Sequence, residues 1–334
     1  MYKIVLSHSL CEEGMRLLQS QGDISVVVAN ESDPDKILPY LFDADAFILR
    51  IGKMTASMIE MCSKLKVIAR PGVGFDTIDV GYAQSHGIPI VITPGENARS
   101  VAEHVFALLF SISKNLFESR DETIKGNYGI RNKYAAFELY GKSIGVVGFG
   151  HIGRIVAEIA KSLGMDVYVY DPYVDKEKMV NSGYVHVDDL STLLSIAKVV
   201  TLHVASTKET RGMFSAKAFS MMQDGSILIN CARGDLVDEV ALLEALQSGK
   251  LYAAAEDMMQ KEPFDIESPL LSLGNFIATP HMAALTRESA ARCAVKAIEG
   301  VMAVLHGNEW MKVANPDVYK SEAWKRRKEE KRQR

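Results

Sequence analysis

The sequence predicts an α/β protein with two doubly wound parallel sheets, and three observations support this. The chain has 334 residues, which fits two domains because one domain usually holds about 100–200 residues. Short apolar runs alternate with amphipathic stretches, a pattern typical of parallel strands covered by helices on both faces. Hydrophobic residues make up 48% of the chain and charged residues 24%, so each domain can bury an ordinary globular core.

The first third of the chain supplies one sheet. Its predicted strands are Lys3–Leu6, Val26–Ala29, Ala46–Leu49, Val67–Ala69 and Ile90–Ile92. Helical patterns such as Cys11–Gln19 and Thr55–Ser63 lie between these strands. A longer apolar-rich segment, Ser100–Phe117, is predicted to form one helix with Ser100 as its N-cap.

A second series of alternating elements follows. Its predicted strands are Ser143–Val147, Asp166–Tyr170, Val199–His203, Ser226–Ile229, Tyr252–Ala255 and Phe276–Ala278. Six strands make a complete dinucleotide-binding sheet. The last helical pattern, Ala290–His306, is free to return to the first sheet.

Charge and cysteine content exclude several classes of function. The net charge of −4 argues against nucleic acid or an anionic membrane surface as partner for the body of the protein. No apolar run approaches the roughly 18 residues of a membrane helix. The segment Lys325–Arg334 has seven basic and two acidic residues; we expect a solvated, frayed end there, with a targeting or nucleic-acid role as the alternative. The four cysteines lie far apart, which predicts no metal site and favours the reducing cytoplasm.

A glycine-rich turn follows the first strand of the second series. Ser143–Val147 runs directly into Gly148–Gly153, whose sequence is Gly-Phe-Gly-His-Ile-Gly, and a helical pattern comes next. Gly148 permits a tight turn, Gly150 lets the backbone approach a pyrophosphate, and Gly153 lets helix and strand pack closely. The free N–H groups and the dipole of the helix N-terminus favour the bound anion.

Asp171 ends the next predicted strand, about 20 residues after the glycines, where dinucleotide-binding folds place an acid. A carboxylate there accepts hydrogen bonds from the adenosine ribose and repels a 2′-phosphate. No arginine follows directly in Pro172-Tyr173-Val174, so the predicted cofactor is NAD rather than NADP. Strand, glycines, helix, strand and acid in this order are far more specific than the glycines alone.

Three polar side chains follow later strands of the same predicted sheet: Arg233, Glu262 and His281. Ligands of open α/β sheets bind at the carboxyl ends of the strands. An arginine can hold a carboxylate through two hydrogen bonds, a histidine can donate a proton near neutral pH, and a glutamate can hold that imidazole in one tautomer. Each residue alone has an ordinary structural explanation, but together they predict hydride transfer to a 2-oxo acid.

Further motifs occur in a characteristic order between about residues 40 and 300. They are Ala69–Asp79, Thr93–Asn97, Ser100–His104, Gly148–Gly153, Asn230–Gly234, Val237–Glu239, Glu262-Pro263 and Thr279–His281. In these stretches the chain resembles the D-isomer-specific 2-hydroxyacid dehydrogenases, and within that family the short-form D-3-phosphoglycerate dehydrogenases.

The resemblance implies a role for each matching residue. It makes Arg233 a substrate ligand, His281 the acid/base and Glu262 the partner of His281. It implies that the backbone of Gly72, Val73 and Gly74 holds the substrate carboxylate. The cofactor contacts that it implies, besides the three glycines, are His151, Ile152, Asp171, His203, Thr210, Cys231 and Asp257.

The resemblance also implies a domain plan. Residues 1–98 and 285–334 are expected to form a flavodoxin-like substrate-binding domain, residues 99–284 a Rossmann NAD-binding domain, with a cleft between them. The segment Ser100–Phe117 matches the family's dimerisation helix, so we expect a homodimer. The family usually has an apolar residue at Glu256 and Val-Phe at Met258-Met259, and a buried glutamate is costly unless it is paired.

The identity of the substrate depends on what binds its C3 end. The resemblance places Arg50, Arg70 and Arg131 where phosphoglycerate dehydrogenases bind the substrate phosphate, which favours a second anionic group such as phosphate or sulfonate. Ile51 stands where a small hydroxyl residue is expected, which favours the alternative of hydroxypyruvate or glyoxylate reduction. Sulfolactate dehydrogenation and an NAD-sensing corepressor are further alternatives. Glu262 argues against a formate dehydrogenase.

Overall fold

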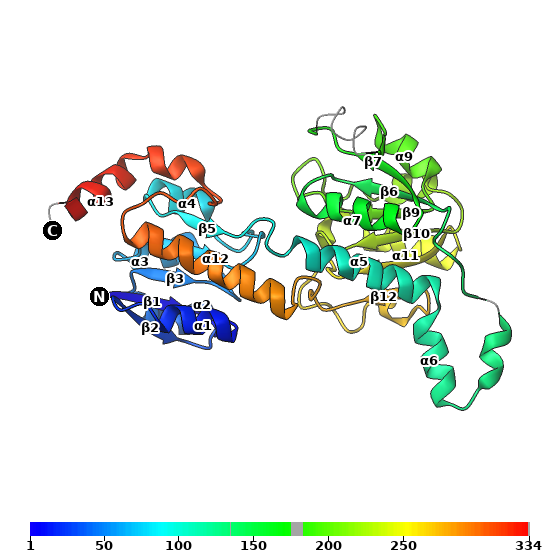
Figure 1. Ribbon diagram of the computed structural model, residues 1–334, viewed down its shortest axis with the longest axis horizontal. Helices are drawn as coiled ribbons and strands as arrows, with labels where there is room; N and C mark the ends of the chain where they lie inside the picture. Colours follow the sequence, from blue (N-terminus) through cyan, green and yellow to red (C-terminus); the bar gives the residue numbers. More distant parts are fainter. Residues whose placement is uncertain (134, 175–182, 333–334) are drawn as a thin grey trace. The chain divides into compact units, whose positions relative to one another are not determined.

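The computed structural model describes residues 1–133, 135–174 and 183–332 (Figure 1). The chain divides into two compact units. Unit 1 consists of Met1–Asn97 and Leu285–Arg334, and unit 2 consists of Ala98–Ala284. Unit 1 is therefore built from both ends of the chain, whereas unit 2 is continuous.

Unit 1 contains a five-stranded parallel sheet in the order β2-β1-β3-β4-β5. The strands are β1 (Tyr2–Leu6), β2 (Ile24–Val28), β3 (Ala46–Ile48), β4 (Val67–Arg70) and β5 (Ile90–Ile92). All five lie close to their predicted positions. The order 2-1-3-4-5 is that of flavodoxin-like sheets, so the prediction of a flavodoxin-like fold is confirmed.

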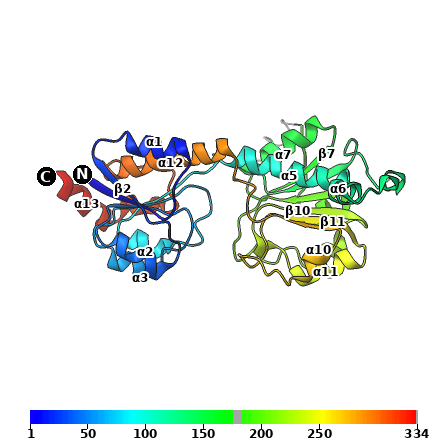
Figure 2. The same ribbon diagram turned by 90° about the horizontal axis from the view of Figure 1, so that it is seen from below.

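Helices cover both faces of the sheet in unit 1 (Figure 2). They are α1 (Glu12–Gln19), α2 (Pro34–Leu41), α3 (Ala56–Met61), α4 (Val80–Ser85) and α12 (Arg287–Leu305). Successive strand residues point to opposite faces, so Ile4 and Leu6 pack with Ile298 and Val301 of α12. Val5, between them, packs on the other face with residues of α2 and α3. The helix α12 thus supplies much of one of the two cores of unit 1.

The basic tail is more ordered than we predicted. After a short 3₁₀ helix, η4 (Pro316–Lys320), the chain forms the helix α13 (Glu322–Arg332). Trp324 is buried against the core that α12 covers, and Nη1 of Arg327 donates a hydrogen bond of 2.6 Å to the Leu65 carbonyl. The buried Trp324 side chain and the hydrogen bond of Arg327 both attach this helix to the rest of unit 1. Residues 333–334 lie outside the described residues.

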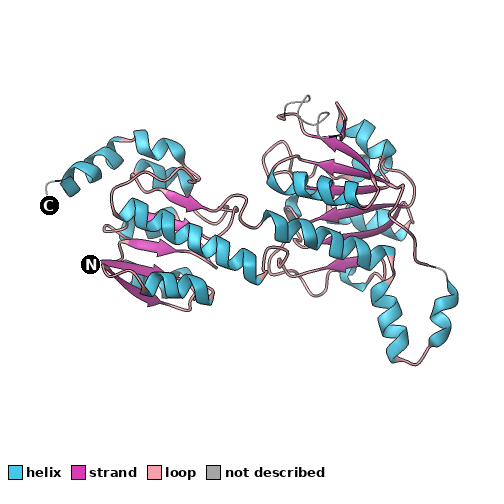
Figure 3. Ribbon diagram, in the orientation of Figure 1, coloured by secondary structure: helices cyan, strands magenta, loops and turns pink. Residues whose placement is uncertain are grey.

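Unit 2 contains a seven-stranded parallel sheet in the order β12-β11-β10-β9-β6-β7-β8 (Figure 3). The strands are β6 (Ser143–Val147), β7 (Asp166–Tyr170), β8 (Val185–His186), β9 (Val199–Leu202), β10 (Ser226–Asn230), β11 (Leu251–Glu256) and β12 (Phe276–Ala278). Numbered from β6, this is the Rossmann order 3-2-1-4-5-6 with one added strand. We predicted six strands, but the sheet has seven. The strand that was missed, β8, has only two residues and pairs only with β7.

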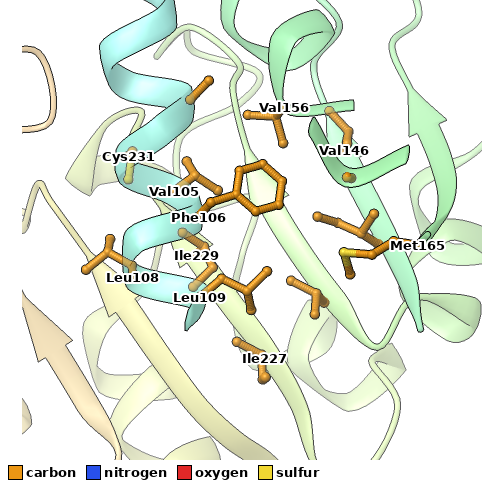
Figure 4. Close-up of a cluster of buried hydrophobic side chains, with 14 of the residues drawn as sticks. Val105, Phe106, Leu108, Leu109, Val146, Val156, Met165, Ile227, Ile229 and Cys231 are labelled. Atoms are coloured by element: carbon orange, nitrogen blue, oxygen red, sulfur yellow. The ribbon is translucent and has the colours of Figure 1, made fainter. Parts of the chain in front are cut away.

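Helices pack on both faces of this sheet as well. They are α5 (Ala98–Ser113), α7 (His151–Ser162), α9 (Leu190–Ile196), α10 (Ala216–Met221) and α11 (Glu239–Gln247). Phe106 and Leu109 of α5 pack with Val156 of α7 against Ile227 and Ile229 of β10 (Figure 4). The helices α10 and α11 cover the opposite face (Figure 2). In the described part of the chain, no helix is both long and apolar enough to cross a membrane.

The helix predicted over Ser100–Phe117 is interrupted. The structure has α5 ending at Ser113 and a separate helix, α6 (Leu116–Ile124), because Asn115 adopts a left-handed conformation with φ of 52°. Asparagine tolerates this conformation better than most residues. Ser100 is not an N-cap: it lies inside α5, and its hydroxyl donates a hydrogen bond of 2.7 Å to the Ala283 carbonyl. The helix α6 and the 3₁₀ helix η1 (Tyr128–Lys133) form an arm that projects from unit 2 (Figure 1).

Candidate active site

The glycine-rich turn joins β6 to α7 at the centre of the sheet in unit 2. Gly148 has a φ of 96°, and a Cβ there would lie 2.8 Å from the His203 carbonyl group. A Cβ on Gly153 would lie only 2.0 Å from the Gly148 carbonyl oxygen. A Cβ on Gly150 would meet no protein atom within 4 Å. The protein's own packing therefore requires glycine at 148 and 153. At 150 it leaves space, and a phosphate group fits there.

Asp171 holds the same turn from the end of β7. Its Oδ2 accepts a hydrogen bond of 2.7 Å from the backbone N–H of Phe149, and its Oδ1 accepts one of 2.9 Å from Tyr173. His151 and Ile152 are the first residues of α7, at the N-terminus that favours an anion. A glycine cradle, a helix N-terminus and a strand-end carboxylate fit the pyrophosphate and ribose of NAD.

Three more of the predicted cofactor residues follow β9 and β10. Burial lowers the pKa of His203 to about 3, so its imidazole is neutral at physiological pH. Its Nε2 lies 3.0 Å from Oγ1 of Thr201. Burial, with the nearby Asp257 carboxylate, raises the pKa of the Cys231 thiol, so this cysteine remains a thiol. Thr210 caps its own loop by donating a hydrogen bond of 2.7 Å to the Ala205 carbonyl.

Glu262 and His281 are brought together by the loops after β11 and β12. Oε2 of Glu262 lies 3.1 Å from Nδ1 of His281. The two side chains are about half exposed, at 42% and 49%, so a small molecule can reach the imidazole. His281 adopts a left-handed backbone with φ of 51°, which is uncommon for a non-glycine residue.

The buried side chain of Asp257 fixes this conformation. Its carboxylate accepts hydrogen bonds from Thr279 Oγ1 (2.5 Å), Met282 N (2.9 Å) and Ala283 N (2.9 Å). Its carbonyl accepts one of 2.8 Å from the N–H of His281. We predicted Asp257 as a cofactor ligand; its hydrogen bonds show that it also holds the turn that carries His281, which no local sequence pattern indicates.

Arg233 lies in the loop after β10. Its Nη1 donates a hydrogen bond of 2.7 Å to the Ala232 carbonyl and lies 3.7 Å from Sδ of Met258. The buried Asn230, a motif residue to which we assigned no role, braces this loop. Its Nδ2 donates to the Arg233 carbonyl (2.9 Å), and its Oδ1 accepts from Ala232 N (3.0 Å). The unusual Met258 therefore lies against the arginine.

The predicted substrate residues outside this sheet belong to two places. In unit 1, Arg50 and Arg70 meet at the ends of β3 and β4, where the Arg70 guanidinium donates to the Arg50 carbonyl. Nη1 of Arg50 donates to the Ser9 carbonyl over 2.9 Å. The loop formed by Gly72, Val73 and Gly74 follows β4 in the same unit. In unit 2, Arg131 lies on the arm, where its Nη1 donates to the Tyr128 hydroxyl over 2.7 Å.

The fold and the site together define a dinucleotide-binding α/β protein with a glutamate–histidine pair at the strand ends of its Rossmann sheet. The chain belongs to the D-isomer specific 2-hydroxyacid dehydrogenase family, whose NAD binding domain matches residues 106–283. The predicted family and the predicted cofactor, NAD, are thereby confirmed.

Individual relatives agree with this assignment. The chain is 38% identical to D-3-phosphoglycerate dehydrogenase of Methanocaldococcus jannaschii, over 94% of this chain and 60% of that protein. It is 35% identical to hydroxypyruvate reductase of Thermotoga maritima, over 90% of this chain and 97% of that protein. D-lactate dehydrogenase of Aquifex aeolicus, solved with NAD and lactic acid, superimposes with a TM-score of 0.81 at 31% identity, covering 92% of this chain and 96% of that one. The chain spans 54–60% of the length of four phosphoglycerate dehydrogenases that it matches.

Proposed function

We propose that this protein transfers a hydride between NAD and the C2 carbon of a D-2-hydroxy acid or its 2-oxo acid. The observation that supports this most directly is the 3.1 Å contact between Glu262 and His281, which follow β11 and β12 of the same parallel sheet whose strand β6 leads into the glycine turn. In open parallel sheets the carboxyl end of the strands binds the ligand. The alternative of an NAD-sensing corepressor is compatible with the same pair and differs in predicting negligible turnover.

Each polar residue then has a distinct task. Arg233 binds the substrate carboxylate and polarises the C2 carbonyl group. Because Nδ1 of His281 is engaged by Glu262, Nε2 is the atom that exchanges a proton with the C2 oxygen. Glu262 holds the tautomer and stabilises the imidazolium that forms when the hydroxy acid is oxidised. NAD, when bound, supplies the hydride acceptor or donor.

The proposed substrate carries a second anionic group, as 3-phosphohydroxypyruvate does. The proximity of Arg50 and Arg70 at one end of the sheet in unit 1 supports this proposal. The backbone loop of Gly72, Val73 and Gly74 beside them is the proposed ligand of the C1 carboxylate. Hydroxypyruvate is the second candidate, because the hydroxypyruvate reductase of Thermotoga maritima matches this chain over nearly its whole length.

A panel of 2-oxo acids tests both proposals. The purified protein is assayed for NADH oxidation with 3-phosphohydroxypyruvate, sulfopyruvate, hydroxypyruvate, glyoxylate and pyruvate. A higher kcat/KM for the first two compounds supports the second-anion site, and Arg50→Ala and Arg70→Ala should then abolish the preference. A higher value for hydroxypyruvate or glyoxylate supports the second candidate. NADH binding without turnover of any compound would contradict the dehydrogenase and favour the corepressor-like alternative.

We also propose a homodimer in which the arm of unit 2 contacts a second copy. Four apolar residues on or beside α6 are exposed: Leu116 (50%), Phe117 (53%), Ile124 (69%) and Tyr128 (78%). Such a concentration of exposed apolar side chains marks an interaction surface. Light scattering should find a dimer that Ile124→Glu dissociates, whereas Val240→Glu, at an equally exposed apolar residue of α11 (69%), should leave it intact. A monomeric wild type would refute the proposal.

We also propose a cytoplasmic location for this protein. All four cysteines are free thiols, which is typical of proteins in a reducing compartment.

A further inference from the structure

Glu256 is an acid in the interior of the sheet that the proposed mechanism does not use. It is the last residue of β11, where its neighbours across the sheet are Asn230 of β10 and Ala278 of β12. Its exposed fraction is 0%.

The carboxyl group of Glu256 is linked to Arg233 through one side chain. Oε1 of Glu256 accepts a hydrogen bond of 3.2 Å from Nδ2 of Asn230. The same Nδ2 donates to the Arg233 carbonyl over 2.9 Å. The Asn230 amide nitrogen therefore joins the two residues through its two hydrogen bonds. A change in the position of the Glu256 carboxyl group alters the hydrogen bonding of the arginine loop.

The surroundings of Glu256 favour its neutral form. Burial, and to a smaller extent the Glu239 carboxylate on α11, raise the pKa of Glu256 to about 8, although the hydrogen bond from Asn230 lowers it. The Glu256 carboxylate also interacts with Cys231, which follows β10. Oε2 of Glu256 accepts no hydrogen bond from the described residues, so a charge on this group is poorly compensated.

We propose that Glu256 is a positioning residue for Arg233: its neutral carboxyl group holds Asn230 so that the arginine loop can bind the substrate carboxylate. This inference rests on the role proposed above for Arg233. Ionisation weakens substrate binding for two reasons. A second negative charge in the interior repels Glu239 and disturbs the strand end, and it also opposes an anionic substrate at Arg233.

The test measures the Kd of oxamate, an unreactive analogue of 2-oxo acids, on NADH-loaded protein between about pH 6 and pH 9.5. If only the neutral form of Glu256 binds well, the wild-type Kd rises about tenfold from pH 7 to pH 9. Glu256→Gln keeps the hydrogen-bonding shape and cannot ionise, so its Kd should rise over this range by about tenfold less than that of the wild type. Glu244→Gln, at an exposed glutamate of α11, should behave as the wild type does.

The outcomes separate this inference from the proposal on which it rests. If Glu256→Gln shows the same rise in Kd as the wild type, Glu256 does not position Arg233, and the dehydrogenase proposal is unaffected. If the wild type binds no oxamate at any pH, both the role of Arg233 and this inference fail. The Kd of NADH is an internal standard, because Glu256→Gln should leave it unchanged, whereas a general loss of structure would raise it.

Discussion

Oε2 of Glu262 lies 3.1 Å from Nδ1 of His281, although 19 residues separate them in the chain. The contact is possible because β11 and β12 are adjacent and parallel, so their following loops leave the sheet at the same end. It determines which imidazole nitrogen is available, and therefore where a substrate oxygen must be placed.

Replacing His281 by alanine removes the proposed proton donor. We expect kcat to fall by about 10²–10⁴-fold, the usual value for a general acid, with the Kd of NADH unchanged. Steady-state rates with the best 2-oxo acid and a fluorescence titration with NADH measure the two quantities. His86→Ala, at the C-cap of α4 in unit 1, is the control and should retain the wild-type rate. An unchanged kcat in His281→Ala would remove this residue from the mechanism.

The glycines of the turn should differ in what an added methyl group does. Gly153→Ala places a Cβ 2.0 Å from a backbone oxygen, so we expect a loss of about 1–3 kcal/mol of stability, as overpacking usually causes. Gly150→Ala meets no protein atom within 4 Å, so its Tm should remain near that of the wild type while NADH binding weakens.

Gly274→Ala is the matched control, since its Cβ would also meet no protein atom within 4 Å. It should leave both stability and NADH binding unchanged. Equal NADH affinity in Gly150→Ala and Gly274→Ala would show that the pyrophosphate does not lie against Gly150.

Asp171→Asn should relax the preference for NAD over NADP. The asparagine keeps an oxygen to accept the Phe149 N–H, so the turn is retained, but it no longer repels a 2′-phosphate. We expect the ratio of kcat/KM for NADH to that for NADPH to fall by about tenfold or more, since hydrogen bonds to charged groups are worth about 1.5–3 kcal/mol. A ratio equal to that of the wild type would mean that Asp171 does not bind the ribose.

The buried Glu256 should make the stability of the protein depend on pH. Its pKa is raised from 4.5 to about 8 in the folded state, so the folded protein keeps a proton that the unfolded chain has lost. The contribution of Glu256 to the free energy of unfolding is then fully present below about pH 4.5. It decreases, by up to about 1.4 kcal/mol per pH unit, as pH rises towards 8. Melting curves of Glu256→Gln lack this contribution, so the variant should gain in Tm over the wild type between about pH 5 and pH 8. A constant difference in Tm would contradict a neutral Glu256.

The sheets and the cofactor turn could be predicted from the sequence because each depends on local patterns. An apolar run such as Ile144–Val147 needs only its own residues to indicate a buried strand, and Gly148 and Gly153 mark a turn by their spacing. The short strand β8 was not predicted because two residues are too few to show a periodic hydrophobic pattern. The break in the long helix depends on one residue, Asn115, within an otherwise helical pattern.

The support of the site could not be predicted in the same way. Asp257 holds groups 22 to 26 residues away, and these come into reach only through the register between β11 and β12. Nothing local distinguishes Asn230 from any asparagine that ends a strand, yet it joins Glu256 to the arginine loop. Such residues are recognised only when the strand ends are seen side by side.

The discontinuous construction of unit 1 has a consequence for how the protein is made. A ribosome completes all of unit 2 before it reaches α12, which covers one face of the sheet in unit 1. Leu18 of α1 packs on the same face early, but Ile4 and Leu6 acquire their contacts with α12 only after nearly 300 further residues have been synthesised. Unit 2 can therefore fold during translation, whereas the core of unit 1 that α12 covers is completed only after unit 2 has been synthesised.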